Sequence, residues 1–188
     1  AVSLLPGRTR NDERVTVKNI FKRAKLRTDV DIATTAFDFQ VIKDGERPDT
    51  IASKVYDDPE LDYVVLITNN ITDIRSEWPL SNRDLYTYML DKYGSDAAIQ
   101  EVHHYETLEV RDDKNRTVLE GGLIVDEDFT FEYTSLGGKL VQVTNPVGPV
   151  TNFTYETLQN DAKRIIRILK VEFVGAFISD MRKMMKYE

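Results

Sequence analysis

Residues 37–70, FDFQVIKDGERPDTIASKVYDDPELDYVVLITNN, carry the strongest structural signals in this 188-residue chain. The stretch opens with alternating apolar and polar side chains over 37–42, a pattern that predicts a β-strand. Residues 43–46 have the composition of a turn, and Pro48 suits the first position of a helix. The local order therefore begins with a strand that leads through a turn into a helix.

Two helices are predicted after the turn. In the first, Ile51, Ala52, Val55 and Tyr56 share one apolar face. Asp58 then suits an N-cap and Pro59 a first helical position, so a second helix begins there. It continues to the two asparagines at 69–70, which end it. We expect a strand–helix–helix unit over 37–70.

Outward from this unit, the patterns change twice. Ser81 with Asp84 resembles a capping box and Gly94 suits a helix stop, so a third helix is predicted over 81–94. Short β segments follow, separated by turn-forming residues, and they predict hairpins or a small meander. These segments cover 101–110, 117–125, 129–133 and 140–143, and an irregular connection is predicted at 145–149. The chain ends with a β-branched run at 163–170, which predicts a buried strand, and an amphipathic helix from Val171.

Charge is unevenly distributed along the chain. Residues 1–29 carry eight Lys/Arg and three Asp/Glu, or +5; residues 161–188 carry seven and four, or +3. The middle, 30–160, carries ten and twenty-five, or −15, and the three parts give the total of −7. Phosphate binding needs a dominant positive field, so we expect no nucleic-acid partner.

Composition excludes several other classes of protein. The chain has no cysteine, which excludes disulfides and thiolate chemistry. No apolar run reaches the roughly 18 residues of a membrane span, so no membrane association is expected. The first residues lack a basic stretch followed by an apolar core, which favours synthesis without a secretory signal. The sequence thus predicts a globular protein made inside the cell.

Several motifs together resemble one protein family. The main motif is VIKDGERPDTIASKVY at 41–56, followed by DPEL at 58–61 and VVLITNN at 64–70. It resembles a LysM-type domain, and more closely the variant in the small LysM-like wedge subunit of contractile-tail phage baseplates of the T-even type. Shorter stretches agree with that family: IFKRA and LRT within 20–28, WPL at 78–80, HYE at 104–106 and NDAKRIIRILK at 160–170.

The resemblance implies an α+β fold with a LysM-like strand–helix–helix core closed by a C-terminal strand. An ordinary LysM domain returns with a strand soon after its second helix, whereas this chain continues into a third helix. We therefore expect residues 164–169 to pair with 37–42. The predicted organisation is an extended N-terminal arm (1–36), a first part of the core (37–70), a helix and β-hairpin insertion (71–160), and a closing strand with a C-terminal helix (161–188).

The resemblance also implies a function. The chain is expected to be a structural subunit of a baseplate wedge, without catalysis, present in one copy per wedge. Its expected partners are other wedge subunits and the neighbouring wedges around the hub, which it would help to join into a sixfold baseplate. The expected location is the virion tail baseplate, after synthesis in the host cytoplasm. The alternative is a LysM-type module that binds peptidoglycan or chitin.

Candidate chemical sites are few. His103 and His104 are the only histidines, and neighbouring strand residues point to opposite faces, so they are not expected to share a metal. The acidic run at 126–128 lacks the glycine and the terminal glutamate of a calcium loop. No nucleophile elbow or phosphate loop is present. We therefore expect no catalytic residue, no metal ligand and no cofactor.

Candidate partner contacts come from apolar side chains and their basic neighbours. The predicted arm is mostly polar but contains an apolar cluster. The C-terminal helix has a wide apolar face that suits either packing on its own sheet, the favoured use, or an adaptable partner surface rich in Met. The single tryptophan, next to Pro79, suits either a core plug or an interface anchor. The expected interface residues are Ile20, Phe21, Arg23, Leu26, Arg27, Trp78, Phe177 and Met181.

Overall fold

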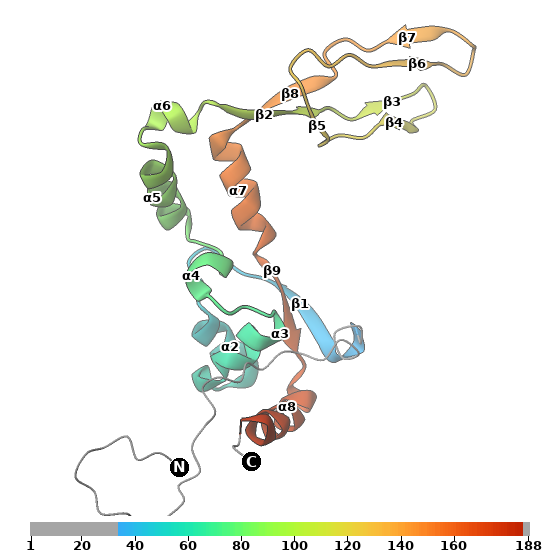
Figure 1. The fold of residues 1–188 in the computed structure, drawn as a ribbon. Helices are drawn as coiled ribbons and strands as arrows, with labels where there is room; N and C mark the ends of the chain where they lie inside the picture. Colours follow the sequence, from blue (N-terminus) through green and yellow to red (C-terminus); the bar gives the residue numbers. More distant parts are fainter. Residues whose placement is uncertain (1–33, 186–188) are drawn as a thin grey trace, which may run out of the picture. The chain divides into compact units, whose positions relative to one another are not determined.

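Helices and strands fall mostly into separate runs along the chain, an α+β arrangement (Figure 1), which a computed structural model describes for residues 34–185. The elements are η1 (Thr34–Ala36), β1 (Phe37–Val41), α2 (Pro48–Tyr56), η2 (Pro59–Leu61), α3 (Asp62–Thr68), α4 (Ile74–Glu77), α5 (Asn82–Tyr93), α6 (Asp96–Ile99), β2 (Val102–Thr107), β3 (Val110–Arg111), β4 (Thr117–Leu119), β5 (Ile124–Val125), β6 (Glu132–Thr134), β7 (Leu140–Gln142), β8 (Val147–Thr151), α7 (Asn152–Ala162), β9 (Ile165–Leu169) and α8 (Val171–Met184). The expected α+β class is confirmed. Among the described residues, no helix has both the length and the apolar character needed to cross a membrane.

The described chain divides into two compact units. Unit 1 contains residues 34–40, 47–72 and 167–185. Unit 2 contains residues 41–46 and 73–166. Each unit has its own buried apolar cluster, and each is described separately below.

The helices of unit 1 begin and end at the residues that the sequence pattern indicates. Pro48 occupies the start of α2, and Asp57 ends that helix in the left-handed conformation, with φ of 56°. The carboxylate of Asp58 then accepts a hydrogen bond from the Glu60 N–H, and Pro59 opens η2. These caps stop one helix and start the next within three residues, so α2 and the η2–α3 segment form the predicted pair of helices.

A two-stranded sheet joins β1 to β9. At one end the Ile42 N–H donates to the Arg164 carbonyl at 2.8 Å, and at the other the Lys170 N–H donates to the Ala36 carbonyl at 3.0 Å. Residue numbers rise along one strand as they fall along the other, so the strands run antiparallel. The expected pairing of 37–42 with 164–169 is confirmed.

The ends of α2 and α3 are also bonded to the backbone of β9. The side-chain amide of Asn69, just after α3, donates to the Arg167 carbonyl and accepts from the Arg167 N–H, each at 2.8 Å. The Tyr56 hydroxyl, at the end of α2, donates to the Leu169 carbonyl at 3.0 Å. Asn69 thereby satisfies backbone groups of β9 that β1 does not reach, and β9 connects the separate elements of unit 1.

The buried cluster of unit 1 collects residues that are far apart in the sequence. Ala36, Phe37, Val64, Leu169 and Val174 form it, and half-buried side chains such as Leu61 and Ile178 pack around it. Val174 comes from α8, so this helix covers one end of the β1–β9 pair. Burial of each large apolar side chain contributes about 1.5–3 kcal/mol.

Tyr56 gives unit 1 a pH dependence in the alkaline range. Burial of the phenol raises the pKa of Tyr56 to about 12 from a usual value of 10. The folded state therefore holds this proton more tightly than the unfolded state, so the contribution is complete below pH 10 and is lost as the pH rises towards 12.

We expect Tyr56→Phe to reduce the free energy of unfolding at pH 7 by about 0.5–1.5 kcal/mol, through loss of the bond to Leu169. The variant should also lose less stability than the wild type between pH 8 and pH 11, as measured by urea unfolding. Tyr88→Phe, at an exposed position, controls for the loss of one phenol. Equal alkaline losses in Tyr56→Phe and the wild type would contradict the assignment.

The helical part of unit 2 is built on α5. The Ser81 hydroxyl accepts from the Asp84 N–H, and Gly94 ends the helix with φ of 84°, which confirms the predicted helix over 81–94. Leu85 and Met89 of α5 pack with Ile99 of α6 in the buried cluster of this unit. The capping pattern therefore predicted both ends of α5 correctly.

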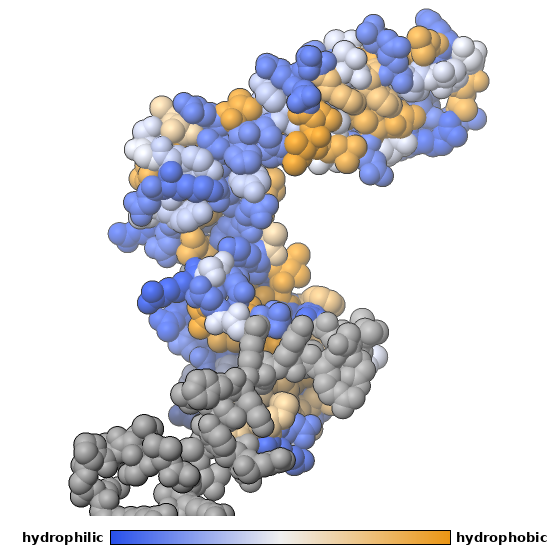
Figure 2. All heavy atoms as spheres, viewed as in Figure 1, coloured by the Kyte–Doolittle hydropathy of each residue, from blue (hydrophilic) through white to orange (hydrophobic). Residues whose placement is uncertain are grey.

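The β part of unit 2 consists of three small sheets. The largest has the order β5-β2-β8, and β3–β4 and β6–β7 form separate antiparallel pairs. The prediction of an irregular connection at 145–149 is wrong, because β8 pairs with β2 from Val102↔Thr151 to Thr107↔Val147. Pro149 argued against a strand in the sequence, because proline has no N–H to donate. However, β8 lies at the edge of its sheet, where such a residue is tolerated. In Figure 2, apolar residues gather on the visible face near β2 and β5.

Candidate interaction surfaces

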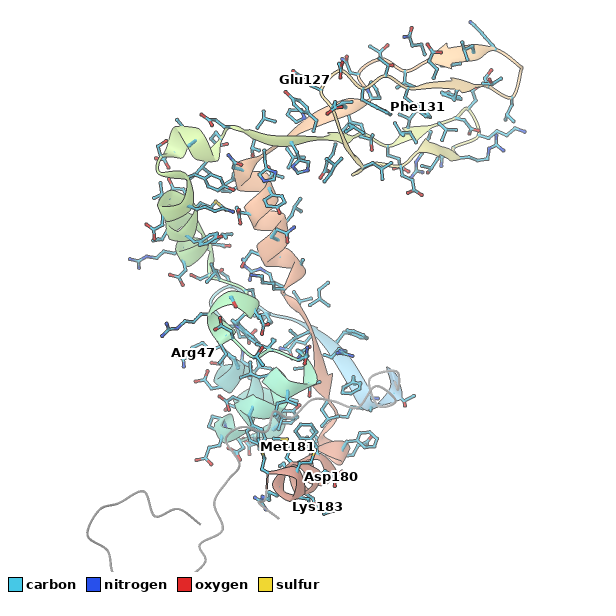
Figure 3. All side chains as sticks on the ribbon, viewed as in Figure 1. Arg47, Glu127, Phe131, Asp180, Met181 and Lys183 are labelled. Carbon is cyan, nitrogen blue, oxygen red and sulfur yellow. The ribbon has the colours of Figure 1, made fainter. Side chains whose placement is uncertain are left out.

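A row of apolar side chains follows one side of α8 and includes two of the expected interface residues. The row, called the α8 stripe below, consists of Phe173, Phe177, Met181 and Met184, spaced by four, four and three residues. Phe177 is half-buried against the cluster of unit 1, whereas Phe173 and Met184 are exposed. Figure 3 shows Met181 on α8 near Asp180 and Lys183, which form an exposed ion pair. The middle of the stripe, at Phe177, therefore packs against unit 1, and both ends of the stripe are exposed.

A second set of exposed apolar side chains lies in and next to the strands of the β5-β2-β8 sheet of unit 2, and sequence reasoning missed it. The set, called the sheet patch below, consists of Leu108, Leu123 and Ile124, with Ile124 75% exposed. Gly148 of β8 leaves room for Leu108, because a Cβ there would lie 3.1 Å from that side chain. The signal available in the sequence was the run of three apolar residues from Leu123, which cannot all turn inward in a strand.

Helix α7 packs through polar side chains. Asn152, Glu156 and Asn160 follow each other at intervals of four residues, and all three are buried. Asn152 donates to the Ala98 carbonyl at 2.9 Å, and the Asn160 amide exchanges two hydrogen bonds with the backbone of Leu80, at 2.7 and 3.0 Å. These bonds hold α7 against the segments around α5 and α6, and leave the buried amides satisfied.

Glu156 is the buried charge of this helix, and its neighbours neutralise it. The Lys92 ammonium lies 2.5 Å from the Glu156 carboxylate, and the Tyr93 hydroxyl donates to the same oxygen at 2.9 Å. The hydrogen bond with Glu156 raises the pKa of Lys92, and burial together with Glu156 raises the pKa of Tyr93. A cavity of about 250 Å³ adjoins Glu156, but the carboxylate is already engaged, so the arrangement is suited to packing rather than proton transfer.

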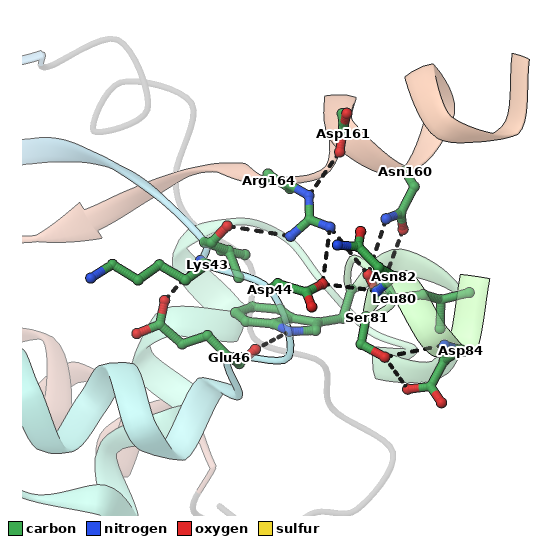
Figure 4. A network of polar contacts seen from close by, with 12 residues as sticks. Lys43, Asp44, Glu46, Leu80, Ser81, Asn82, Asp84, Asn160, Asp161 and Arg164 are labelled. Carbon is green, nitrogen blue, oxygen red and sulfur yellow. Dashed lines mark hydrogen bonds and ion pairs between the residues drawn. The ribbon is translucent and has the colours of Figure 1, made fainter. Parts of the chain in front are cut away.

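Arg164 lies at the centre of a network of polar contacts in unit 2 (Figure 4). Its guanidinium lies 2.8 Å from the Asp161 carboxylate and 3.6 Å from Asp44, and it donates to the carbonyls of Ile42 and Leu80. Asp44 in turn accepts from the Asn82 N–H at 2.8 Å. The network joins the loop after β1, the start of α5 and the end of α7.

Trp78 lies inside unit 2 and not on its surface. The side chain is 7% exposed, and its indole N–H donates to the Glu46 carbonyl at 2.9 Å. The structure thus gives Trp78 the core-plug role, one of the two roles that the sequence left open. The expectation that Trp78 is an exposed anchor for a partner requires correction, because Pro79 is buried too and the indole N–H already has its hydrogen-bond partner.

The remaining expected interface residues, Ile20, Phe21, Arg23, Leu26 and Arg27, lie outside the described residues, as does most of the predicted arm 1–36. The acidic run at 126–128 does not form a metal site with its neighbours: within residues 34–185, no group of three or more His, Asp or Glu side chains is arranged to hold a metal ion. Glu127 instead forms a hydrogen bond with Tyr105, and this bond raises the pKa of the Tyr105 hydroxyl.

The two histidines are closer than the sequence predicted. Their Nδ1 atoms lie 2.8 Å apart, so the expectation that the rings point to opposite faces is wrong. The cause is an irregularity in the β2–β8 pairing between Val102 and His104, which turns one of the two residues out of the regular alternation.

Comparison with known proteins identifies the family to which this chain belongs. The chain belongs to a family of phage base plate wedge proteins: a family model described as Base plate wedge protein 53 matches residues 5–184. One relative, the baseplate wedge protein gp53 of Enterobacteria phage T4, is 25% identical over 176 residues, which cover 90% of this chain and 80% of the relative. The family resemblance found in the sequence is confirmed, and neither comparison supports the glycan-binding alternative.

Proposed function

We propose that this chain is a structural subunit of a phage baseplate wedge in the virion tail, made in the host cytoplasm, and that it has no catalytic role. The observation that carries the proposal is the family match over residues 5–184. The buried charge of unit 2 supports it as well, because Glu156 is held by Lys92 and Tyr93 and stabilises the packing of α7.

The proposed assembly is one copy per wedge, in contact with other wedge subunits and with neighbouring wedges around the hub of a sixfold baseplate. A subunit in a ring needs two different surfaces, since a head-to-tail contact uses a different patch on each side. The α8 stripe of unit 1 and the sheet patch of unit 2 are two such apolar surfaces. The apolar residues Ile20, Phe21 and Leu26, with the basic Arg23 and Arg27, supply a third in this proposal.

We also propose that unit 1 is a LysM-like core divided by the insertion 71–160, with an arm at 1–36 and the closing segment at 161–188. The support is the order strand, helix, helix, and a late strand antiparallel to the first, in β1, α2, α3 and β9. In this proposal the insertion carries the sheet patch, so one small core would serve two contact surfaces.

Apolar contacts are expected to dominate the affinity of these surfaces. Burial of a Phe or Met side chain contributes about 1.5–3 kcal/mol, whereas an exposed ion pair such as Asp180–Lys183 contributes about 0–1 kcal/mol. Charged residues at the edge of a contact mainly affect the rate of encounter.

The test compares two phenylalanines of equal exposure in different places. Phe173, in the α8 stripe, is 41% exposed, and Phe153, on α7, is 42% exposed. We expect Phe173→Ser to raise the Kd for the purified remaining wedge proteins at least about tenfold, because about 1.4 kcal/mol of apolar contact is lost. Binding is measured by sedimentation velocity or interferometry with the full chain.

Phe153→Ser should leave that Kd within about twofold of the wild type and should change the melting temperature by a similar amount as Phe173→Ser. Equal weakening by both variants would assign the effect to stability and would remove the α8 stripe from the interface. A full-length wild-type chain that forms no complex with the other wedge proteins would overturn the proposed function itself.

A further inference from the structure

The β part of unit 2, residues 102–151, buries little of its apolar surface. It consists of three small sheets, and apart from Pro146 the only buried apolar residue within this fully described stretch is Leu119. The sheet patch lies here, with Leu108, Leu123 and Ile124 each at least 50% exposed. Two-stranded antiparallel pairs are only marginally stable in water on their own. A partner that covers the patch would therefore stabilise this part of the chain as well as bind to it.

Two members of the patch lie on the same face of the β5-β2-β8 sheet. Ile124 of β5, Glu106 of β2 and Gly148 of β8 are paired directly across the three strands, so side chains at these positions share one face. A Cβ at Gly148 would lie 3.1 Å from the Leu108 side chain, which places Leu108 over Gly148 on that face. The row therefore has an apolar side chain at each end and the carboxylate of Glu106 in the middle.

Charge distinguishes the sheet patch from the α8 stripe. Residues 102–151 carry nine Asp/Glu and four Lys/Arg, which gives −5, whereas the segment 161–188 carries four and seven, which gives +3. Acidic residues also directly follow the apolar ones at the patch: Glu109 comes after Leu108, and Asp126 comes after the last residue of β5. An apolar partner with basic residues therefore fits the sheet patch better than it fits the α8 stripe.

Residues 15–28 of this chain have the composition that such a partner needs. They carry five Lys/Arg and no Asp/Glu, and they contain the apolar Ile20, Phe21 and Leu26. The segment lies outside the described residues, in the part of the chain that precedes Thr34 of η1. The 33 residues before Thr34 can span at most about 110 Å, so their length permits contact with a second copy.

We propose that residues 15–28 of one copy bind the sheet patch of a second copy, with Phe21 as the main apolar contact. The proposal rests on the proposed function, in which single copies stand in neighbouring wedges of a ring. The contact uses a different surface on each copy, so it is head-to-tail and can repeat around a closed ring. A contact within one copy would occupy both surfaces without joining two wedges. The opposite charges, +5 for residues 15–28 and −5 for residues 102–151, orient the encounter.

The first experiment measures how a fluorescein-labelled peptide of residues 15–28 binds to the full chain, by fluorescence anisotropy. We expect saturable binding that weakens when NaCl is raised from about 0.1 M to about 0.5 M, because salt screens the opposite charges. Ile124→Ser in the full chain should raise the Kd at least about tenfold, as should Phe21→Ser in the peptide. Leu158→Ser, at a 56% exposed position on α7, is the matched control and should leave the Kd unchanged.

The second experiment separates contact between copies from contact within one copy. Chains with a photo-crosslinking analogue of phenylalanine in place of Phe21 are prepared with either the light or the heavy isotope of nitrogen. They are mixed in equal amounts and assembled with the other wedge proteins before irradiation. We expect crosslinked peptides that join a light chain to a heavy chain, with the crosslink within residues 102–126.

Several outcomes would overturn the proposal while the proposed function stands. Crosslinks confined to chains of the same isotope would show that the segment binds its own copy, and crosslinks only to other wedge proteins would assign it another partner. Equal Kd values for Ile124→Ser and Leu158→Ser, with both folds checked by circular dichroism, would remove the sheet patch from the contact. If the full chain forms no complex with the other wedge proteins, the proposed function fails, and the peptide titration still tests the contact by itself.

Discussion

A chain that ends at Arg164 is expected to lose the folded structure of unit 1, although it lacks only β9 and α8. Within residues 34–185, strand β1 pairs with β9 alone. Without β9, the amide of Asn69 and the hydroxyl of Tyr56 also lose the backbone groups of Arg167 and Leu169. An unpaired strand beside two short helices is not independently stable.

The energetic size of this loss follows from burial. Ile166, Ile168 and Leu169 of β9 are all buried, and together they contribute about 4.5–9 kcal/mol at about 1.5–3 kcal/mol for each side chain. That is comparable with the whole stability of an ordinary domain, about 5–15 kcal/mol.

Hydrogen exchange followed by mass spectrometry measures the outcome in peptides from residues 47–70. We expect α2 and α3 to lose protection in the chain that ends at Arg164. A chain that ends at Lys170 is the matched control, because it keeps β9 and loses α8; there the same peptides should retain partial protection. Full protection of α2 and α3 in the shorter chain would show that unit 1 does not depend on β9.

The second large effect is expected for Trp78→Ala, in unit 2. This variant removes a buried indole and the hydrogen bond from its N–H to the Glu46 carbonyl. Removal of a buried tryptophan costs about 3–5 kcal/mol. Trp78→Phe keeps most of the apolar contact and loses only the N–H, so it should cost about 1–3 kcal/mol.

Urea unfolding monitored by circular dichroism measures these differences, with Tyr88→Ala as the control for an exposed aromatic residue in the same unit. Trp78 is the single tryptophan of the chain, so its fluorescence in the wild type also reports on the site directly. The emission should be blue-shifted and poorly quenched by iodide. A cost below about 1 kcal/mol for Trp78→Ala, or emission typical of a water-exposed indole, would contradict the packing role.

The sequence by itself determined the elements whose signals are local. Pro48, Asp58 and Pro59 set the starts of helical segments in unit 1, and Ser81 with Gly94 set both ends of α5. These residues act through their own backbone angles or through hydrogen bonds to groups two or three positions away, so a reader of the sequence has all the necessary information. The pairing of β1 with β9 is long-range, yet it could be predicted because the family resemblance implied a missing closing strand.

Tertiary structure alone decided the features that depend on partners far along the chain. Helix α7 was not predicted, because its buried side consists of Asn152, Glu156 and Asn160, and hydrophobic periodicity does not detect a polar buried face. These side chains can be buried only because Ala98, Lys92 and Leu80 supply their hydrogen-bond partners, 54 to 80 residues away. The choice between core and surface for Trp78 depended in the same way on the Glu46 carbonyl, and the meeting of the two histidines on an irregularity in the β2–β8 pairing. Whether a polar or amphipathic side chain is buried depends on the group that forms a hydrogen bond with it. That group comes close only when the chain has folded.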